Sequence, residues 1–97
     1  MAEKKSILSK IRELKPTLQK KFGINKLAIF GSFAKGLHTE NSDIDIVILD
    51  MEQKNLLTIA KAQIFLENIL KIKVDIGLYD SLRPFIRNSI KKDLIYV

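Results

Sequence analysis

The sequence predicts one small α/β domain of the α+β kind, spanning residues 1–97, in which helices cover a small sheet. Apolar residues recur at helical spacing near the N-terminus and in the middle of the chain, and short apolar segments bounded by polar or glycine residues alternate with them. A length of 97 residues suits one domain, and a hydrophobic content of 46% is that of an ordinary globular protein.

The N-terminal part of the chain predicts two helices. Apolar side chains recur at helical spacing within Glu3–Leu14, and basic residues occupy the other face. Pro16 disfavours continuation of this helix but suits the first turn of a second, shorter one. Gly23 is expected to end that second helix as its C-terminal cap.

Two strands and a polar connection follow. Residues 26–30 are apolar and end at Gly31, which predicts a buried strand. Residues 31–42 predict a polar connection with a single helical turn around residues 33–35. Residues 44–49 form the clearest strand in the chain.

A long helix is predicted over residues 55–70, and its apolar surface is broad. Two interpretations stay open: this surface makes a second contact beyond the sheet, or the helix is fully covered within a compact domain. The expected apolar stripe consists of Leu56, Ile59, Ala60, Ile64, Leu66 and Leu70, with Ala62, Phe65 and Ile69 partly outside it.

The C-terminal part predicts a strand, a helix and a final strand. Residues 72–78 alternate between apolar side chains and the set Lys73, Asp75 and Gly77, as a strand with one buried face does. Asp80 or Ser81 is expected to cap a helix that begins near Pro84. Residues 94–97 are expected to form a short strand.

The composition limits the partners and the compartment. Seventeen basic and 11 acidic residues give a net charge of +6, which suits an anionic partner or reflects a solvated lysine surface. The chain has no cysteine, no apolar stretch of membrane-spanning length and no secretory signal, so we expect a cytoplasmic protein without membrane contact. His38 is the one histidine, which disfavours zinc, and the aromatics are not interleaved with lysines, which disfavours direct nucleic-acid binding.

Three carboxylates are the candidate catalytic and metal-binding groups. Asp43 and Asp45 share one face at the start of the strand 44–49, because residues two apart on a strand point the same way. Two carboxylates about 4 Å apart repel by roughly 4 kcal/mol at an effective dielectric of about 20, which calls for a proton or a cation between them. Oxygen ligands favour Mg²⁺ or Mn²⁺. Asp75 joins the pair if its strand lies beside 44–49; two ions roughly 4 Å apart then fit, and Asp75 orients or deprotonates the acceptor hydroxyl.

The residues that precede these aspartates suit a triphosphate. Gly31 allows close approach of a phosphate, and the Ser32 hydroxyl and the local amides can donate to its oxygens. Lys35 is placed to neutralise the departing pyrophosphate. Ten residues separate Ser32 from Asp43. The alternative interpretation is a Gly-Ser turn followed by solvated aspartates, but it does not explain why both motifs adjoin strands.

These residues resemble the DNA polymerase β-like nucleotidyltransferase superfamily, and above all its minimal nucleotidyltransferase (MNT) group. The resemblance rests on Gly31, Ser32 and the three aspartates, and the phrase spanning residues 29–36 is typical of the group. It implies the nucleotidyltransferase fold with a mixed sheet of three to four strands, ATP as substrate, and two Mg²⁺ ions, for which Mn²⁺ can substitute. Lys35 is a departure, because the group often has arginine there, whose guanidinium forms a bidentate fork that lysine lacks.

The resemblance also implies a biological role. Many MNT proteins resemble antitoxins paired with an all-helical HEPN toxin, which they silence by transferring AMP to a toxin tyrosine. We therefore expect a protein adenylyltransferase with a HEPN partner, and the helix over residues 55–70 is one candidate contact. Two alternatives stay open: transfer to a small molecule such as an aminoglycoside or to an RNA end, and a binding module that masks its partner with nucleotide bound but not turned over.

Overall fold

The computed structural model describes residues 4–36 and 43–97, with the side chain of Ser32 outside that description. The helices are α1 (Lys4–Phe22), α2 (Gly31–Lys35), α3 (Leu56–Leu70) and α4 (Pro84–Ile90), with short 3₁₀ turns at Tyr79–Ser81 and Lys91–Asp93. The strands are β1 (Ile24–Phe30), β2 (Ile44–Met51), β3 (Val74–Leu78) and β4 (Ile95–Tyr96).

The four strands form one mixed sheet in the order β3-β2-β1-β4. β1 is antiparallel to both β2 and β4, whereas β2 and β3 are parallel, as the connection through α3 requires. This architecture confirms the predicted small mixed sheet covered by helices. β3 lies at one end of the strand order, so it is an edge strand of the sheet.

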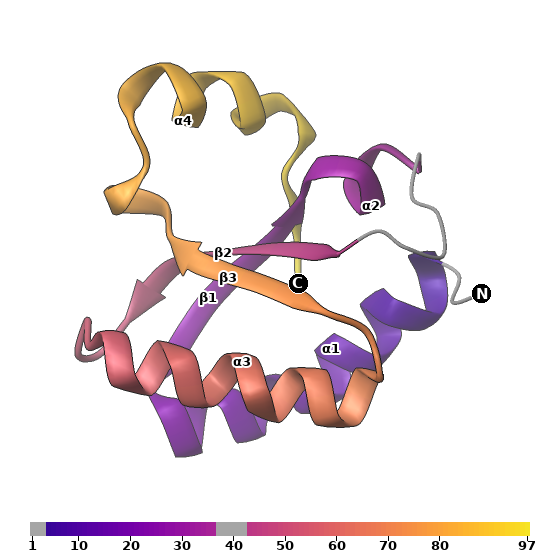
Figure 1. The fold of residues 1–97 in the computed structure, drawn as a ribbon, viewed down its shortest axis with the longest axis vertical. Coiled ribbons are helices and arrows are strands. Elements are labelled where there is room, and N and C mark those ends of the chain that lie inside the picture. The colour runs from indigo at the N-terminus through magenta and orange to yellow at the C-terminus, as the bar shows by residue number, and fades with distance from the viewer. Residues whose placement is uncertain (1–3, 37–42) are drawn as a thin grey trace.

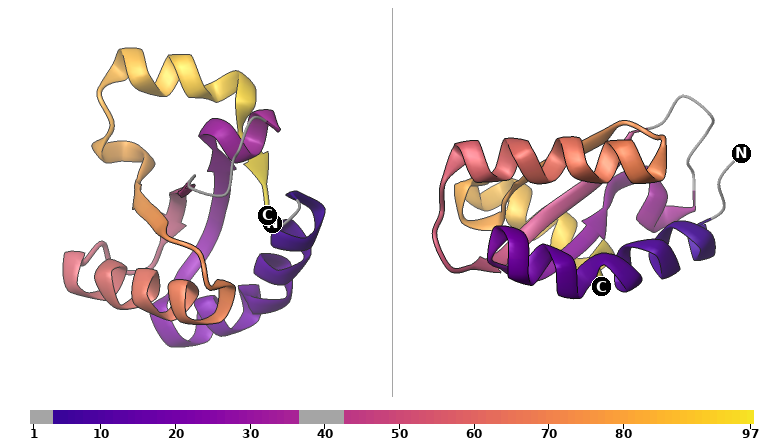
Figure 2. Two further views of the ribbon diagram at one scale, coloured as in Figure 1. Left: turned by 45° about the vertical axis from the view of Figure 1, so that its right-hand side comes forward. Right: turned by 90° about the horizontal axis from the view of Figure 1, so that it is seen from below.

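One face of the sheet carries the hydrophobic core. Helices α1 and α3 lie side by side across this face, and α4 lies beyond the opposite face (Figure 1 and Figure 2). Alternate residues of β2 point into the core: Ile44, Ile46 and Ile48 are almost completely buried, as predicted. The intervening residues of β2 therefore face the side of the sheet that α1 and α3 do not cover.

The predicted break at Pro16 is wrong, because α1 is one continuous helix with Pro16 inside it. A proline in a helix interior removes one backbone hydrogen bond and crowds the preceding turn, which bends a helix or breaks it. Here Ile11 and Leu18, on either side of the proline, are both fully buried, so core packing holds the two halves together. Figure 2 shows the resulting curve of α1 around the sheet. Gly23 ends the helix as predicted, with a φ of 68°.

Helix α3 has the predicted extent, but its buried stripe differs from the predicted one. The residues that it buries are Ile59, Ala62, Leu66 and Leu70. Leu56, Leu57 and Ile64 are 81%, 64% and 58% exposed. The apolar surface of α3 is broader than the core can cover, and the residues that are buried are those that pack against α1 and β3. The helix is therefore not fully covered, and the expected second contact of its apolar surface stays a prediction.

Side chains fix both ends of α3. The Asn55 side chain accepts hydrogen bonds from the amides of Leu57 and Thr58 and caps the N-terminus of the helix. Near the C-terminus, a carboxylate oxygen of Glu67 accepts the Val74 amide at 2.9 Å. This contact fastens the helix to the first residue of β3.

The predicted caps of the last helix are wrong. Asp80 and Ser81 belong to a 3₁₀ turn that follows β3, and the residue at the N-cap of α4 is Arg83, which makes no side-chain capping bond. Pro84 opens α4 and supplies the helical φ without needing a cap. His38 and the rest of 37–42 lie outside the described residues. No helix in the described part of the chain is long and apolar enough to cross a membrane.

Candidate functional site

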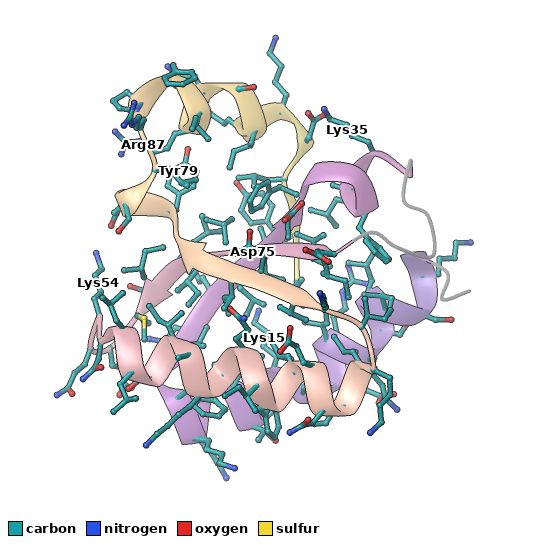
Figure 3. All side chains as sticks on the ribbon, in the orientation of Figure 1. Lys15, Lys35, Lys54, Asp75, Tyr79 and Arg87 are labelled. Carbon is teal, nitrogen blue, oxygen red and sulfur yellow. The ribbon has the colours of Figure 1, made fainter. Side chains whose placement is uncertain are left out.

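The parallel pairing of β2 and β3 brings two of the predicted carboxylates side by side. Asp45 and Asp75 are direct partners in the register of these strands. The pairing is fixed at its start, where the Ile44 amide donates to the Lys73 carbonyl at 2.9 Å. Both aspartates point to the sheet face opposite the core, because their neighbours along each strand are buried. Figure 3 shows Asp75 on this face, away from α3.

Asp43 immediately precedes β2 and completes a patch of three acidic residues. Burial of the Asp45 carboxyl raises its pKa, and the negative charges of Asp75 and then Asp43 raise it further. Asp43 and Asp75 are exposed, whereas Asp45 is half-buried between them. In the described part of the chain, no lysine or arginine forms an ion pair with any of the three. The patch therefore has a deficit of positive charge.

Gly31 is in contact with the central carboxylate of this patch. Its φ of 76° lies in the left-handed region that favours glycine. A Cβ atom at this position would collide with a carboxylate oxygen of Asp45 and lie 3.2 Å from its Cγ. Sequence reasoning assigned the open side of Gly31 to a phosphate, whereas the structure shows that it also makes room for Asp45. Ser32 lies in the first turn of α2, and its side chain is outside the described residues.

Lys35 has a protein partner that the sequence did not suggest. Its Nζ lies 3.7 Å from a carboxylate oxygen of Asp93, and the two side chains are 52% and 39% exposed. An ion pair this long and exposed contributes little to stability and is easily exchanged. Lys35 ends α2, on the same short helix as Gly31, so it stays within reach of an anion bound there.

The donor chemistry of the patch fits a divalent cation. Its ligand atoms are carboxylate oxygens, which suit hard ions such as Mg²⁺ and Mn²⁺. Burial and the like charges of Asp75 and Asp43 raise the pKa of Asp45, and a bound cation would offset that repulsion. Within residues 4–36 and 43–97, no three acidic or histidine side chains converge closely enough to enclose an ion. Binding an ion therefore requires the exposed side chains of Asp43 and Asp75 to turn towards Asp45.

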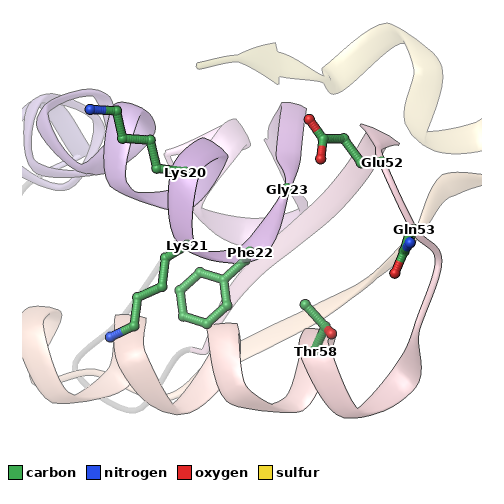
Figure 4. A pocket seen from close by; sticks show the side chains of 7 residues that line it. All are labelled: Lys20, Lys21, Phe22, Gly23, Glu52, Gln53 and Thr58. Carbon is green, nitrogen blue, oxygen red and sulfur yellow. The ribbon is translucent and has the colours of Figure 1, made fainter.

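One hollow of the surface lies away from the acidic patch. Its volume is about 250 Å³, and it is lined by Lys20, Lys21, Phe22, Gly23, Glu52, Gln53 and Thr58 (Figure 4). It adjoins the start of β1, whereas Gly31 follows the end of that strand. The seven residues of β1 separate this hollow from the acidic patch by roughly 20 Å. In the acidic patch itself, the side chains of Asp43 and Asp75 are exposed, so substrates can approach them directly.

The mixed sheet with its glycine corner and aligned aspartates defines a nucleotidyl-transferring class of protein. Residues 11–97 match the nucleotidyltransferase domain family, and the chain belongs to this family.

The chain is also similar to more narrowly described proteins. A Methanocaldococcus jannaschii protein named as a candidate protein adenylyltransferase is 40% identical over 95 residues, covering 93% of this chain and 97% of the relative. Protein adenylyltransferase MntA of Thermococcus cleftensis is 31% identical over 83 residues, covering 86% and 84%.

Two solved structures share the fold. One, described as a candidate minimal nucleotidyltransferase, has a TM-score of 0.79 at 29% identity and covers 97% of this chain and 95% of its own. A toxin–antitoxin complex with AMP-PNP has a TM-score of 0.70 at 20% identity, covering 84% of this chain and 67% of its own.

Proposed function

We propose that this protein is an adenylyltransferase that moves AMP from ATP to a tyrosine hydroxyl of a partner toxin. The observation that carries the proposal is the alignment of Asp45 with Asp75 across two parallel strands, with Gly31 pressed against Asp45. This arrangement places a backbone corner and a carboxylate pair next to each other, where a triphosphate and an acceptor hydroxyl can meet.

The reaction exchanges a phosphoanhydride bond of ATP for a phosphoester bond on the acceptor. The acceptor oxygen bonds to the α-phosphorus of ATP, the bond between this phosphorus and the bridging oxygen breaks, and pyrophosphate leaves with that oxygen. The hydroxyl proton passes to Asp75, which is exposed and faces the open side of the sheet, and from there to water. Catalysis is then mainly a matter of positioning and of neutralising charge.

The remaining residues hold the nucleotide. Gly31 and Ser32 receive the phosphates at the corner between β1 and α2. Lys35 exchanges its weak contact with Asp93 for the departing pyrophosphate. Mg²⁺, which would be held by Asp43, Asp45 and Asp75, would supply the positive charge that draws the triphosphate to this acidic patch.

The acceptor assignment is supported by the relatives. Those that cover nearly all of this chain are named protein adenylyltransferases. Chains of the same fold occur in structures described as toxin–antitoxin complexes, one of them with an ATP analogue. We therefore place this chain on the antitoxin side of such a pair, with an all-helical HEPN toxin as the partner.

Incubation of the chain with α-labelled ATP, Mg²⁺ and the partner encoded beside it tests the proposal. We expect label on the partner, loss of that label when the partner's acceptor tyrosine becomes phenylalanine, and loss of it in Asp75→Asn. The same assay with Mg²⁺ removed by a chelator, and then with Mn²⁺ added, tests the metal requirement.

The double variant Asp43→Asn/Asp45→Asn separates catalysis from masking. An enzyme loses both label transfer and partner inhibition in this variant. If inhibition persists without transfer, the chain silences its partner by binding alone and the proposed activity is wrong.

A further inference from the structure

Gly77 lies in the interior of a strand, but its backbone conformation does not require a glycine. It lies in β3, where glycine costs about 0.5–1 kcal/mol relative to residues with a side chain. It is not among the glycines with positive φ, so other residues can adopt its conformation. A Cβ atom at this position would meet nothing within 4 Å, so no neighbour excludes a side chain either.

The bare position lies beside the proposed acceptor base. Gly77 follows Asp75 by two residues on the same strand, so both face the same side of the sheet, about 7 Å apart. The register partner of Gly77 is Val47, which is only 1% exposed. Other parts of the protein therefore cover the sheet at Val47, while the surface over Gly77 is open.

Two more features delimit this open surface. β3 is the end strand of the sheet, so the side away from β2 is free of further strands in the described part of the chain. Beyond the end of β3, the Tyr79 side chain rises towards α4, which carries Arg87 (Figure 3). We call this bare stretch of β3, with Gly77 between Asp75 and Tyr79, the notch.

Resting on the proposed function, we propose that this notch receives the phenol ring of the acceptor tyrosine. A strand glycine commonly marks a place where a ligand approaches the backbone, and aromatic rings pack well over such glycines in sheets. The spacing between Gly77 and Asp75 is similar to the length of a phenol side chain. A ring that covers Gly77 therefore brings its hydroxyl to the Asp75 carboxylate.

The arrangement of the strands assigns this side of the site to the acceptor. Gly31, the proposed phosphate corner, approaches Asp45 from β1. Asp75 and Gly77 lie on β3, on the other side of β2. ATP and tyrosine then meet over β2 from opposite sides, which is the approach that an in-line displacement needs.

Substitutions of increasing size at Gly77 test the notch. We expect Gly77→Leu to lower label transfer to the partner by about a hundredfold or more, because a displaced acceptor loses alignment with the α-phosphorus. Gly77→Ala should lower it less, and the affinity for ATP with Mg²⁺, measured by calorimetry, should stay within about threefold of wild type because the phosphate corner is untouched. Thermal unfolding of each variant shows that the fold is intact.

Each other outcome has a definite meaning. If a folded Gly77→Leu keeps full transfer activity, the notch does not receive the acceptor tyrosine. The same conclusion holds if a loss of ATP affinity accounts for the whole loss of transfer, because the nucleotide then occupies this surface. Ser9→Leu, at an exposed position of α1, is the matched small-to-leucine control and should transfer label normally. If the wild-type protein does not label the partner, the proposed function itself is wrong, whatever the Gly77 variants do.

Discussion

At the scale of single residues, the site depends on a contact between a glycine and a carboxylate. Gly31 adopts a left-handed backbone conformation and leaves space that the Asp45 carboxylate occupies. The same carboxylate has a raised pKa because it is partly buried and lies near Asp75 and Asp43. The central acidic group is therefore partly buried, faces two like charges and depends on the absence of a side chain at residue 31.

Alanine substitutions at two glycines separate backbone strain from crowding. Gly31 and Gly36 have similar φ values, 76° and 73°, but a Cβ at Gly36 would meet nothing within 4 Å. We expect Gly36→Ala to lower the free energy of unfolding by about 1 kcal/mol, which is the cost of the left-handed conformation. Gly31→Ala should cost about 1–2 kcal/mol more because Asp45 must move. Urea denaturation measures both, and equal losses would show that Asp45 is not crowded.

Removal of the central charge should stabilise the free protein while it abolishes activity. Because the pKa of Asp45 is raised in the folded state, its charged form is disfavoured there relative to the unfolded chain. The stability present below the ordinary value of 3.8 is thus lost as pH rises through the raised pKa. We expect Asp45→Asn to raise the unfolding free energy at pH 7 by no more than about 1 kcal/mol, since solvent screens part of the repulsion.

Denaturation at two pH values checks this expectation. The gain from Asp45→Asn should be present at pH 7 and shrink as both states become protonated in acid. The control is Asp50→Asn on the same strand, where the carboxylate accepts a hydrogen bond from Asn25 at 3.2 Å and has Lys54 nearby. A comparable gain in that control would assign the effect to net charge and not to the acidic patch.

At the scale of elements, α3 positions the strand that carries Asp75. Its N-terminus is capped by Asn55, and near its C-terminus Glu67 holds the amide of Val74. Four side chains along one stripe of the helix are buried beneath the sheet. Loss of the Glu67 contact near the C-terminus of α3 would therefore act directly on the start of β3.

Loss of the Asn55 cap should destabilise the fold without touching the site. Asn55→Ala removes the acceptor for the amides of Leu57 and Thr58, which costs about 1 kcal/mol. Urea denaturation measures this loss, with Asn68→Ala as the control because Asn68 is exposed on the same helix. Alanine favours the helix interior, so Asn68→Ala should not lower stability. An equal loss in both variants would show that the effect is not specific to the cap.

The elements also show which features can be read from the sequence. Alternation of apolar and other residues predicted β3, because one face of that strand is buried and the other is not, whereas β2 was predicted as a short apolar segment. The break at Pro16 was predicted wrongly because helix propensity depends only on the local sequence. It does not include the burial of Ile11 and Leu18, one on each side of the proline. The buried stripe of α3 was misplaced for a related reason: a broadly apolar helix has several possible buried faces, and only its neighbours choose among them.

For the site, spacing suggested that Asp43 and Asp45 share a face, and Asp75 was expected to join them if its strand lay beside 44–49. The strand register places Asp45 next to Asp75. The contact of Gly31 with Asp45 and the pairing of Lys35 with Asp93 depend on residues brought together only by folding. The sequence does contain the signal for the notch, since Asp75 and Gly77 are two residues apart on an alternating strand.

At the scale of the whole molecule, two surfaces that a partner can use lie on opposite sides of the sheet. The exposed apolar residues of α3 are on the core side, and the acidic patch is on the other. A partner that contacts both surfaces must pass around an edge of the sheet. β3 supplies an edge beside Asp75.

A charge placed on α3 tests whether this helix contacts the partner. Ile64 is 58% exposed, and its burial in an interface would contribute roughly 1 kcal/mol or more. We expect Ile64→Glu to weaken binding of the toxin, measured by calorimetry, by about tenfold or more while the melting temperature of the free chain changes little. Lys61→Glu on the same helix controls for the charge change, and unchanged binding in both variants would leave α3 outside the interface.

The hydrogen bond between Glu67 and Val74 has a consequence for self-association. The Lys73 carbonyl points towards β2, so the amide of the next residue points outwards, along the open side of β3. An outward amide of this kind invites strand addition by a second chain. Because the Glu67 carboxylate accepts the Val74 amide, this amide is not available to a second strand, and a negative charge lies where such a strand would begin to pair. The contact between Glu67 and Val74 therefore disfavours strand addition at β3, the strand to which the acceptor tyrosine is proposed to bind.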